Sequence, residues 1–133
     1  MRPQMSPTRP IVAVLDDEPQ LRKALRRLLS THGFCVEDYE RGDDFLSGLP
    51  SHRPDCLVLD LHMPEVNGFD ILAAFEAKDI SVPVVVITGH DGPGMQERAL
   101  ALGAFAYLTK PVDESALLSA IRSSLSPNQP VPT

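Results

Sequence analysis

Short apolar runs alternate along this chain with longer segments whose apolar residues recur at helical spacing. Several of these runs are continuous, without a polar residue at every second position, which is typical of strands covered on both faces of a sheet. The runs occupy residues 11–15, 34–36, 56–59, 84–87 and 104–108, and the run at 34–36 is the weakest. The pattern therefore predicts five short strands.

The segments between the runs have the pattern of helices. In the first, apolar residues from Leu21 to Leu29 recur along one side, and four basic residues lie on the other. Pro19 suits the first turn of this helix, and Gly33 follows its last turn. Further helices are expected over residues 43–48, 68–77, 93–102 and 113–125, the last with Asp113 as its N-cap.

Strands and helices thus alternate five times along the chain. Right-handed crossovers fold such a chain into an α/β domain, a doubly wound parallel sheet with helices on both faces. In this architecture ligands bind outside the carboxyl ends of the strands. We expect the domain to occupy residues 10–125, between a disordered arm at 1–9 and a proline-rich linker or tail at 126–133.

Composition and charge narrow the function. The chain has 133 residues, of which 43% are hydrophobic and 23% charged, as in an ordinary soluble domain. Its net charge of −6 argues against direct nucleic-acid binding, which depends on Lys and Arg neutralising phosphates. No run is long enough to cross a membrane and the first residues lack the apolar core of a signal peptide, so we expect a cytoplasmic protein.

The cysteines and two of the histidines suggest no chemistry. Cys35 and Cys56 each lie in an apolar run, so both are expected to be reduced and buried in the core. They show no spacing typical of a zinc site. His32 and His52 lie in predicted surface connections and are expected to be inert.

Polar residues follow the apolar runs. Asp16 and Asp17 follow the first strand, Asp60 the third, Thr88 the fourth and Lys110 the fifth. In a parallel sheet all of these face the same edge. Three gathered carboxylates repel one another unless a hard divalent cation sits among them, and oxygen ligands favour Mg²⁺.

The other strand-end residues suit phosphate. Lys110 is a flexible cation that can bind a phosphoryl oxygen, Thr88 offers a hydroxyl donor, and Gly89 leaves room for a bulky group. A carboxylate nucleophile, a metal, a lysine and a hydroxyl make a site for phosphoryl transfer. A simpler interpretation of Asp16 and Asp17, as acids favouring a helix N-terminus, does not explain the other members.

Four motifs give the chain a family resemblance over roughly residues 9–125. They are DDE at 16–18, LDLHMPEVNG at 59–68, VVVITG at 84–89 and GAFAYLTKP at 103–111. Together they resemble the receiver domain of bacterial two-component response regulators, and the segment from Thr88 to Pro111 is most similar to FixJ/LuxR-type receivers. The resemblance implies a flavodoxin-like (CheY-like) fold with five parallel strands in the order 2-1-3-4-5.

The resemblance also implies roles for the acidic residues. Asp60 would be the phosphorylated residue, and Mg²⁺ (or Mn²⁺) would be bound by Asp17, Asp60 and the backbone carbonyl of His62, with Asp16 acting through a metal-bound water. A phosphoryl group would come from a phosphohistidine on a sensor histidine kinase or a histidine phosphotransferase. The chain would be a switch that assists its own phosphorylation and dephosphorylation, rather than a turnover enzyme.

Other roles concern the response to phosphorylation. Lys110 and Thr88 would bind the phosphoryl group, with Gly89 beside them, and Tyr107 would rotate inward as Thr88 moves. Tyr107 is also compatible with simple core packing. The Lys110–Pro111 bond would be cis. The face formed by the fourth helix, fifth strand and fifth helix would then control a partner or an output domain, for example in transcription regulation. It could do so by forming a homodimer.

Two histidines occupy positions that vary among receivers and tune the lifetime of the phosphoryl group. These are His62 and His90, which would either shield the group from water or position water to attack it. The alternative is that both are exposed loop residues with no kinetic role; metal binding through the imidazoles is disfavoured. The basic side of the first helix, 22–27, is a solvated face in the simple interpretation and a kinase docking face in the other.

Other classes of function are less consistent with the motifs. An aspartate-nucleophile phosphohydrolase would carry a second Asp where His62 stands. A pure interaction module would not need the intact set of strand-end residues. A flavin carrier of the same fold would need a phosphate-binding loop after the first strand, where this chain has acids.

Overall fold

The computed structural model describes residues 9–126. Its five strands are parallel and lie in the order β2-β1-β3-β4-β5. The strands are β1 (Ile11–Leu15), β2 (Cys35–Tyr39), β3 (Cys56–Asp60), β4 (Val84–Thr88) and β5 (Ala106–Thr109). The helices are α1 (Pro19–Thr31), α2 (Gly42–Gly48), α3 (Gly68–Ala77), α4 (Met95–Ala101) and α5 (Glu114–Leu125). Except for residues 9 and 126, the predicted arm and tail lie outside the described residues.

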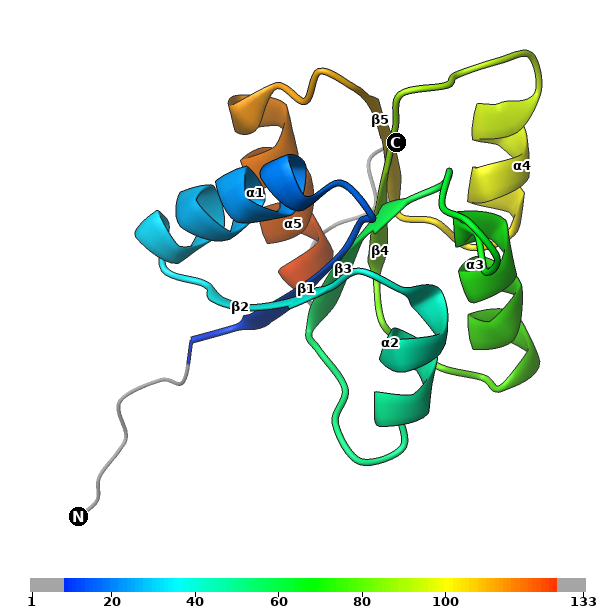
Figure 1. Cartoon of the computed structure of the whole chain (residues 1–133), viewed down its shortest axis with the longest axis horizontal. Helices are drawn as coiled ribbons and strands as arrows, with labels where there is room; N and C mark the ends of the chain where they lie inside the picture. Colours follow the sequence, from blue (N-terminus) through cyan, green and yellow to red (C-terminus); the bar gives the residue numbers. More distant parts are fainter. Residues whose placement is uncertain (1–8, 127–133) are drawn as a thin grey trace.

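The helices form two layers, one on each face of the sheet. Helices α1 and α5 cover one face, and α2, α3 and α4 cover the other (Figure 1). The predicted fold class is thereby confirmed: a doubly wound five-stranded parallel sheet with the strand order 2-1-3-4-5 and five helices. Parallel strands bring their carboxyl ends to one edge, and this edge holds the predicted site.

The central strands are apolar throughout because both of their faces are covered. Every residue of β3 and β4 is buried. Along β3 the side chains alternate between the layers, so that Val58 packs in the α1/α5 core while Leu57 and Leu59 pack in the other. The continuous apolar runs in the sequence arise from this arrangement.

Strand β2, at the edge of the sheet, and helix α4 differ from the expected boundaries. Strand β2 extends from Cys35 to Tyr39 and not over 34–36, because an edge strand tolerates the polar residues Glu37 and Asp38. The same position explains a wrong prediction: Cys35 is exposed, and only Cys56 is buried. Helix α4 begins at Met95 rather than at residue 93, because Gly94 before it takes a left-handed conformation, with φ of 79°.

Candidate functional site

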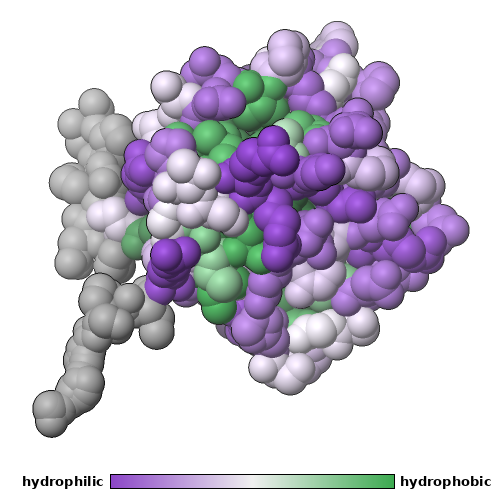
Figure 2. Space-filling view, turned by 60° about the vertical axis from the view of Figure 1, so that its left-hand side comes forward, coloured by the Kyte–Doolittle hydropathy of each residue, from purple (hydrophilic) through white to green (hydrophobic). Residues whose placement is uncertain are grey.

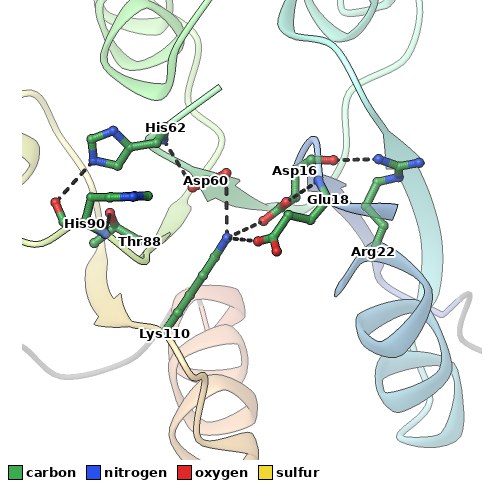
Figure 3. Close-up of polar contacts among 8 residues, drawn as sticks. All are labelled: Asp16, Glu18, Arg22, Asp60, His62, Thr88, His90 and Lys110. Carbon is green, nitrogen blue, oxygen red and sulfur yellow. Dashed lines mark hydrogen bonds and ion pairs between the residues drawn. The ribbon is translucent and has the colours of Figure 1, made fainter. Parts of the chain in front are cut away.

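Four strand ends bring the predicted residues together. Asp16 follows β1, Asp60 ends β3, Thr88 ends β4 and Lys110 follows β5. Carboxylate oxygens of Asp16, Asp17 and Asp60 lie within 4.8 Å of one another. Figure 3 shows the Lys110 side chain reaching Asp60 and Asp16. The carboxyl edge of the sheet therefore holds an acidic cluster with one lysine in it.

Burial gives two of these acids unusual proton affinities. Asp16 is 0% exposed and Asp60 2% exposed. Loss of hydration raises the pKa of Asp60 to about 6, and the neighbouring Asp16 adds to the effect. Burial also raises the pKa of Asp16, although the hydrogen bond from the Glu18 amide and the nearby Lys110 oppose the rise. The protein's own groups therefore do not fully stabilise the negative charge of either the Asp16 or the Asp60 carboxylate.

Lys110 is surrounded by acids. Its Nζ lies 2.8 Å from Glu18 Oε1, 3.1 Å from Asp16 Oδ2 and 3.7 Å from Asp60 Oδ2. Partial burial disfavours the ammonium, but the contacts with Glu18 and Asp16 outweigh it and raise the pKa of Lys110 above its ordinary value. The lysine therefore stays charged next to the buried carboxylates.

The donor set fits a hard divalent cation. Among the described residues, Asp16 Oδ2 is a buried oxygen that accepts no hydrogen bond, although it forms the ion pair with Lys110. Asp60 Oδ1 accepts a long bond, 3.2 Å, from the His62 amide. Carboxylate oxygens that are close together, buried and short of donors are the ligands that Mg²⁺ prefers. Asp16, Asp17 and Asp60 would therefore bind such a cation, and its positive charge would offset their negative charges.

The loop after β3 is held in place by tight packing. Gly68 has no space for a side chain, because a Cβ there would lie 2.7 Å from the carbonyl oxygen of Asp60. Next to it, Asn67 and Asp70 form a reciprocal capping box at the start of α3, each side chain bonding the other's backbone amide. Helix α3 therefore starts directly against the backbone of Asp60.

Thr88 and the two predicted tuning histidines lie on the side of Asp60 that faces away from Asp16 (Figure 3). Thr88 is buried and its Oγ1 accepts a hydrogen bond from the His90 amide, 3.1 Å away. His62 and His90 are exposed, with ring centroids 4.7 Å apart in an edge-to-face arrangement. His62 Nε2 also lies 3.2 Å from the His90 carbonyl oxygen. The pair bridges the loops after β3 and β4.

Tyr107 and Gly89 complete the predicted set. Tyr107 is partly buried and donates a hydrogen bond of 2.7 Å to Asp91 in the loop after β4. Burial and this contact raise the pKa of Tyr107 to about 12. A Cβ at Gly89 would touch the Lys110 stem at 3.5 Å, so Gly89 lies beside the lysine. The Lys110–Pro111 bond is cis.

Sequence reasoning missed three side chains that contact the site residues. Glu18 pairs with Lys110, Asp91 binds Tyr107, and Arg22 donates to the backbone carbonyl of Asp16. On the basic side of α1, which the sequence leaves as either a solvated or a docking face, the Arg22 side chain is only 16% exposed. Glu18 could have been found, because it directly follows the acidic pair. The other two contacts leave no local signal in the sequence.

The chain belongs to the response regulator receiver domains, whose sequence model matches residues 12–122. It is 36% identical over 115 residues to the transcriptional regulatory protein FixJ of Azorhizobium caulinodans, covering 86% of this chain and 54% of that protein. It is 33% identical over 121 residues to the response regulator protein TodT of Pseudomonas putida, covering 91% of this chain and 53% of that protein. The chain thus spans about half the length of these relatives.

Solved structures agree with this assignment. The crystal structure of FixJ-N matches with a TM-score of 0.81 and 31% identity, covering 91% of this chain and 97% of that one. The response regulator StyR matches with a TM-score of 0.80 and 39% identity, covering 90% of this chain and 61% of that one. Receiver domains of this family generally bind Mg²⁺ and interact with histidine kinases. Within residues 9–126, no helix has the length and apolar character needed to span a membrane.

Proposed function

We propose that this chain is a phosphoacceptor switch in which Asp60 takes a phosphoryl group from the phosphohistidine of a sensor kinase or a histidine phosphotransferase. A carboxylate oxygen of Asp60 attacks the phosphorus, the bond from phosphorus to the imidazole nitrogen breaks, and an acyl phosphate forms. The single observation that carries the proposal is the buried Asp60, which shares one edge of the sheet with Asp16, Asp17 and Lys110.

The surrounding residues prepare Asp60 for this reaction. Asp16, Asp17 and Asp60, with the His62 carbonyl predicted as a further ligand, would hold Mg²⁺ or Mn²⁺, which when bound supplies positive charge for the carboxylates and the phosphoryl oxygens. Lys110 already lies 3.7 Å from Asp60 Oδ2 and is placed to bind a phosphoryl oxygen. The exposed pair of His62 and His90 lies where it would control the access of water.

Phosphorylation would be transmitted through Thr88. Its hydroxyl is bonded to the His90 amide, so turning toward a phosphoryl group would break that bond and move the loop after β4. Tyr107, which is bonded to the same loop through Asp91, would then change position. Two large apolar residues are exposed in this part of the chain, Leu100 on α4 at 43% and Phe105 just before β5 at 47%, and they suit a homodimer contact or an output partner.

A groove beside Lys110 suits the phosphodonor protein. It has a volume of about 360 Å³ and lies between α1 and the chain after β5. Its apolar lining includes Leu21, Leu28 and Val112. Figure 2, which brings the left-hand side of Figure 1 with α1 forward, shows hydrophobic patches among hydrophilic residues on this face. A partner bound there would reach Asp60 past Lys110. Because the relatives include transcriptional regulators, we infer a role in transcription control.

Labelling with a small donor tests the reaction. The purified chain is incubated with acetyl phosphate and Mg²⁺, and bound phosphate is measured by intact mass. We expect one acid-stable, alkali-labile phosphoryl group per chain, absent without the cation and absent in Asp60→Asn. Asp44→Asn, which removes an exposed acid on α2, is the matched control and should be labelled normally. Labelling of the Asp60→Asn variant, or steady multiple-turnover hydrolysis of phosphate esters, would contradict the proposal.

A further inference from the structure

Arg22 connects α1 to the end of β1. Its Nη1 donates a hydrogen bond of 2.8 Å to the backbone carbonyl oxygen of Asp16. Figure 3 shows this bond approaching Asp16 from the α1 side, while the Asp16 side chain turns the opposite way, toward Lys110. Arg22 thus binds the backbone of a site residue without touching its carboxylate.

Asp16 is held at three of its four polar atoms. Its amide donates to the carbonyl oxygen of Tyr39 at 3.2 Å, and its Oδ1 accepts from the Glu18 amide at 2.8 Å. Arg22 holds the third atom, the carbonyl oxygen. The fourth atom, Oδ2, is buried and faces the site, and within residues 9–126 its contact is the ion pair with Lys110. The direction of this oxygen therefore depends on how firmly the backbone of Asp16 is fixed.

Arg22 is itself oriented by a second contact. Its Nε lies 3.6 Å from Asp38 Oδ2 on β2, and Asp38 also pairs with Arg26 at 2.8 Å. Arg26 lies one turn further along α1, with a side chain 53% exposed against 16% for Arg22. The two arginines therefore share a partner but differ in the contact with Asp16, which makes Arg26 a matched control.

We propose that Arg22 is a positioning residue of the cation site. By holding the carbonyl of Asp16, it fixes the turn that carries Asp16 and Asp17, and so sets the separation of their carboxylates from that of Asp60. The inference rests on the proposed function in one respect, the binding of a divalent cation by these acids. A contact that orients a ligand from behind typically contributes 10-fold or more to metal affinity.

Charge alone would act in the opposite direction. A guanidinium close to the site repels a divalent cation, so its removal would strengthen cation binding if Arg22 acted only through its field. Positioning predicts weaker binding instead. The sign of the change in Mg²⁺ affinity thus separates the two roles, and a purely structural role in folding would leave the affinity of the folded protein unchanged.

Mg²⁺ titrations followed by NMR chemical shifts measure this affinity in the whole chain. We expect Arg22→Gln to weaken Mg²⁺ binding about 10-fold and Arg26→Gln to change it less than about twofold. Arg22→Lys, which keeps the charge but replaces the planar guanidinium, should lie between wild type and Arg22→Gln. Urea unfolding shows whether Arg22→Gln is folded. If it is not, the Mg²⁺ affinities of Arg22→Lys and Arg26→Lys are compared instead. Unchanged or tighter Mg²⁺ binding in folded Arg22→Gln would overturn the inference.

A second measurement separates this inference from the proposed function. Labelling by acetyl phosphate should recover in Arg22→Gln when Mg²⁺ is raised to saturation, because the defect lies in affinity and not in Asp60. A defect that persists at saturation would also overturn the inference. If the wild type takes up no phosphate at all while Arg22→Gln still weakens Mg²⁺ binding, the proposed function fails and the role of Arg22 stands.

Discussion

The two sides of the site are built differently. On the side of β1 and β3, Asp16 is bonded through its amide, carbonyl and Oδ1, and Gly68 packs against the Asp60 backbone. On the side of β4 and β5, the chain passes from Thr88 through three glycines into α4, and the last of them, the N-cap residue Gly94, has no side chain to cap the helix. The acids of the site thus lie on the side of β1 and β3, the fixed half. The side of β4 and β5 is the half that we propose to respond to phosphorylation, the responding half.

The helices that follow β3 and β4 show the same contrast. Asn67 and Asp70 satisfy each other's amides at the start of α3, a contact typically worth about 1 kcal/mol, whereas α4 has only seven residues and no side-chain cap. On the responding half, Tyr107 on β5 donates a long-range hydrogen bond to Asp91 in the loop after β4. A switch needs an element with two accessible arrangements, and we propose that the uncapped α4 and the glycine-containing loop before it supply that element.

The largest expected effect is the loss of stability when a methyl group is added at Gly68, on the fixed half. Gly68→Ala places a Cβ 2.7 Å from both the Asp60 carbonyl oxygen and Leu61 Cα, so backbone must move and stability should fall by about 3 kcal/mol. Gly94→Ala, the matched change on the responding half, meets nothing within 4 Å and costs only the strain of φ 79°, about 1 kcal/mol. Urea unfolding of both variants measures the difference; a larger loss in Gly94→Ala would reverse the comparison.

A smaller effect of opposite sign is expected when a buried charge is removed. Burial raises the pKa of Asp60 from 3.8 to about 6, so the folded state binds its proton more tightly than the unfolded state does. The resulting cost to stability is present above pH 6 and disappears as pH falls toward 4. Asp60→Asn should therefore stabilise the protein by about 1–2 kcal/mol at pH 8 without Mg²⁺, and by roughly half as much at pH 5.

Chemical denaturation across this pH range checks the prediction. The exposed-acid control Asp44→Asn should show no comparable pH-dependent gain. A stabilisation of the Asp60→Asn variant that stays constant from pH 5 to pH 8 would mean that the charge of Asp60 is not the cause. Added Mg²⁺ should reduce the gain, because it offsets the repulsion among Asp16, Asp17 and Asp60 in the wild type.

Much of the site could be predicted from the sequence. The runs that became β3 and β4 are continuous and buried on both faces, and the polar residue after each run marks the edge where a parallel sheet gathers its strand ends. Asp16, Asp60 and Lys110 were placed together on this basis, and the structure brings them within ion-pair distance. The prediction succeeded because strand direction alone fixes which ends meet.

The rest depended on contacts between elements that leave no periodic signal. Edge strand β2 alternates in burial, so its apolar run was too short to show its length, and Cys35 was wrongly placed in the core. The start of α4 depends on the left-handed conformation of Gly94, which the pattern of apolar residues does not report. The bond from Arg22 to the Asp16 carbonyl joins a helix to a strand end, and only coordinates reveal it.

A titration of Tyr107 tests the contact with Asp91 on the responding half. Burial first, and then the hydrogen bond to Asp91, raises the pKa of this phenol to about 12. Asp91→Asn removes the adjacent negative charge, so the pKa of Tyr107 should fall by about one unit, and stability should fall by less than about 1 kcal/mol. Ultraviolet difference titration measures the phenol, with Tyr107→Phe defining the signal of Tyr39.

Hydrogen exchange extends this test to the loop. In Asp91→Asn the amides of residues 89–94 should exchange several-fold faster, while those around Asn67 should be unchanged, because the Tyr107 bond lies on the responding half only. Faster exchange at both loops would show that the two halves open together. An unchanged pKa of Tyr107 would mean that Asp91 does not hold the phenol in solution.

The smallest expected effect tests strain inside the fixed half. Glu65, in the loop between Asp60 and Gly68, has φ of 68°, a left-handed conformation that glycine adopts without strain. Its carboxylate forms an exposed ion pair with Arg41, and such pairs contribute little. Glu65→Gly should therefore stabilise the protein by about 0.5 kcal/mol, the relief of strain slightly exceeding the lost pair.

Asp79 provides the comparison at the far end of α3. It has φ of 56° and no side-chain ion pair among the described residues, so Asp79→Gly should stabilise slightly more than Glu65→Gly. Urea unfolding measures both, and Mg²⁺ affinity should stay within about twofold in each, because Gly68 and Asn67 rather than Glu65 fix the backbone next to Asp60. Weaker Mg²⁺ binding in Glu65→Gly alone would show instead that the strained residue helps to shape the acidic cluster.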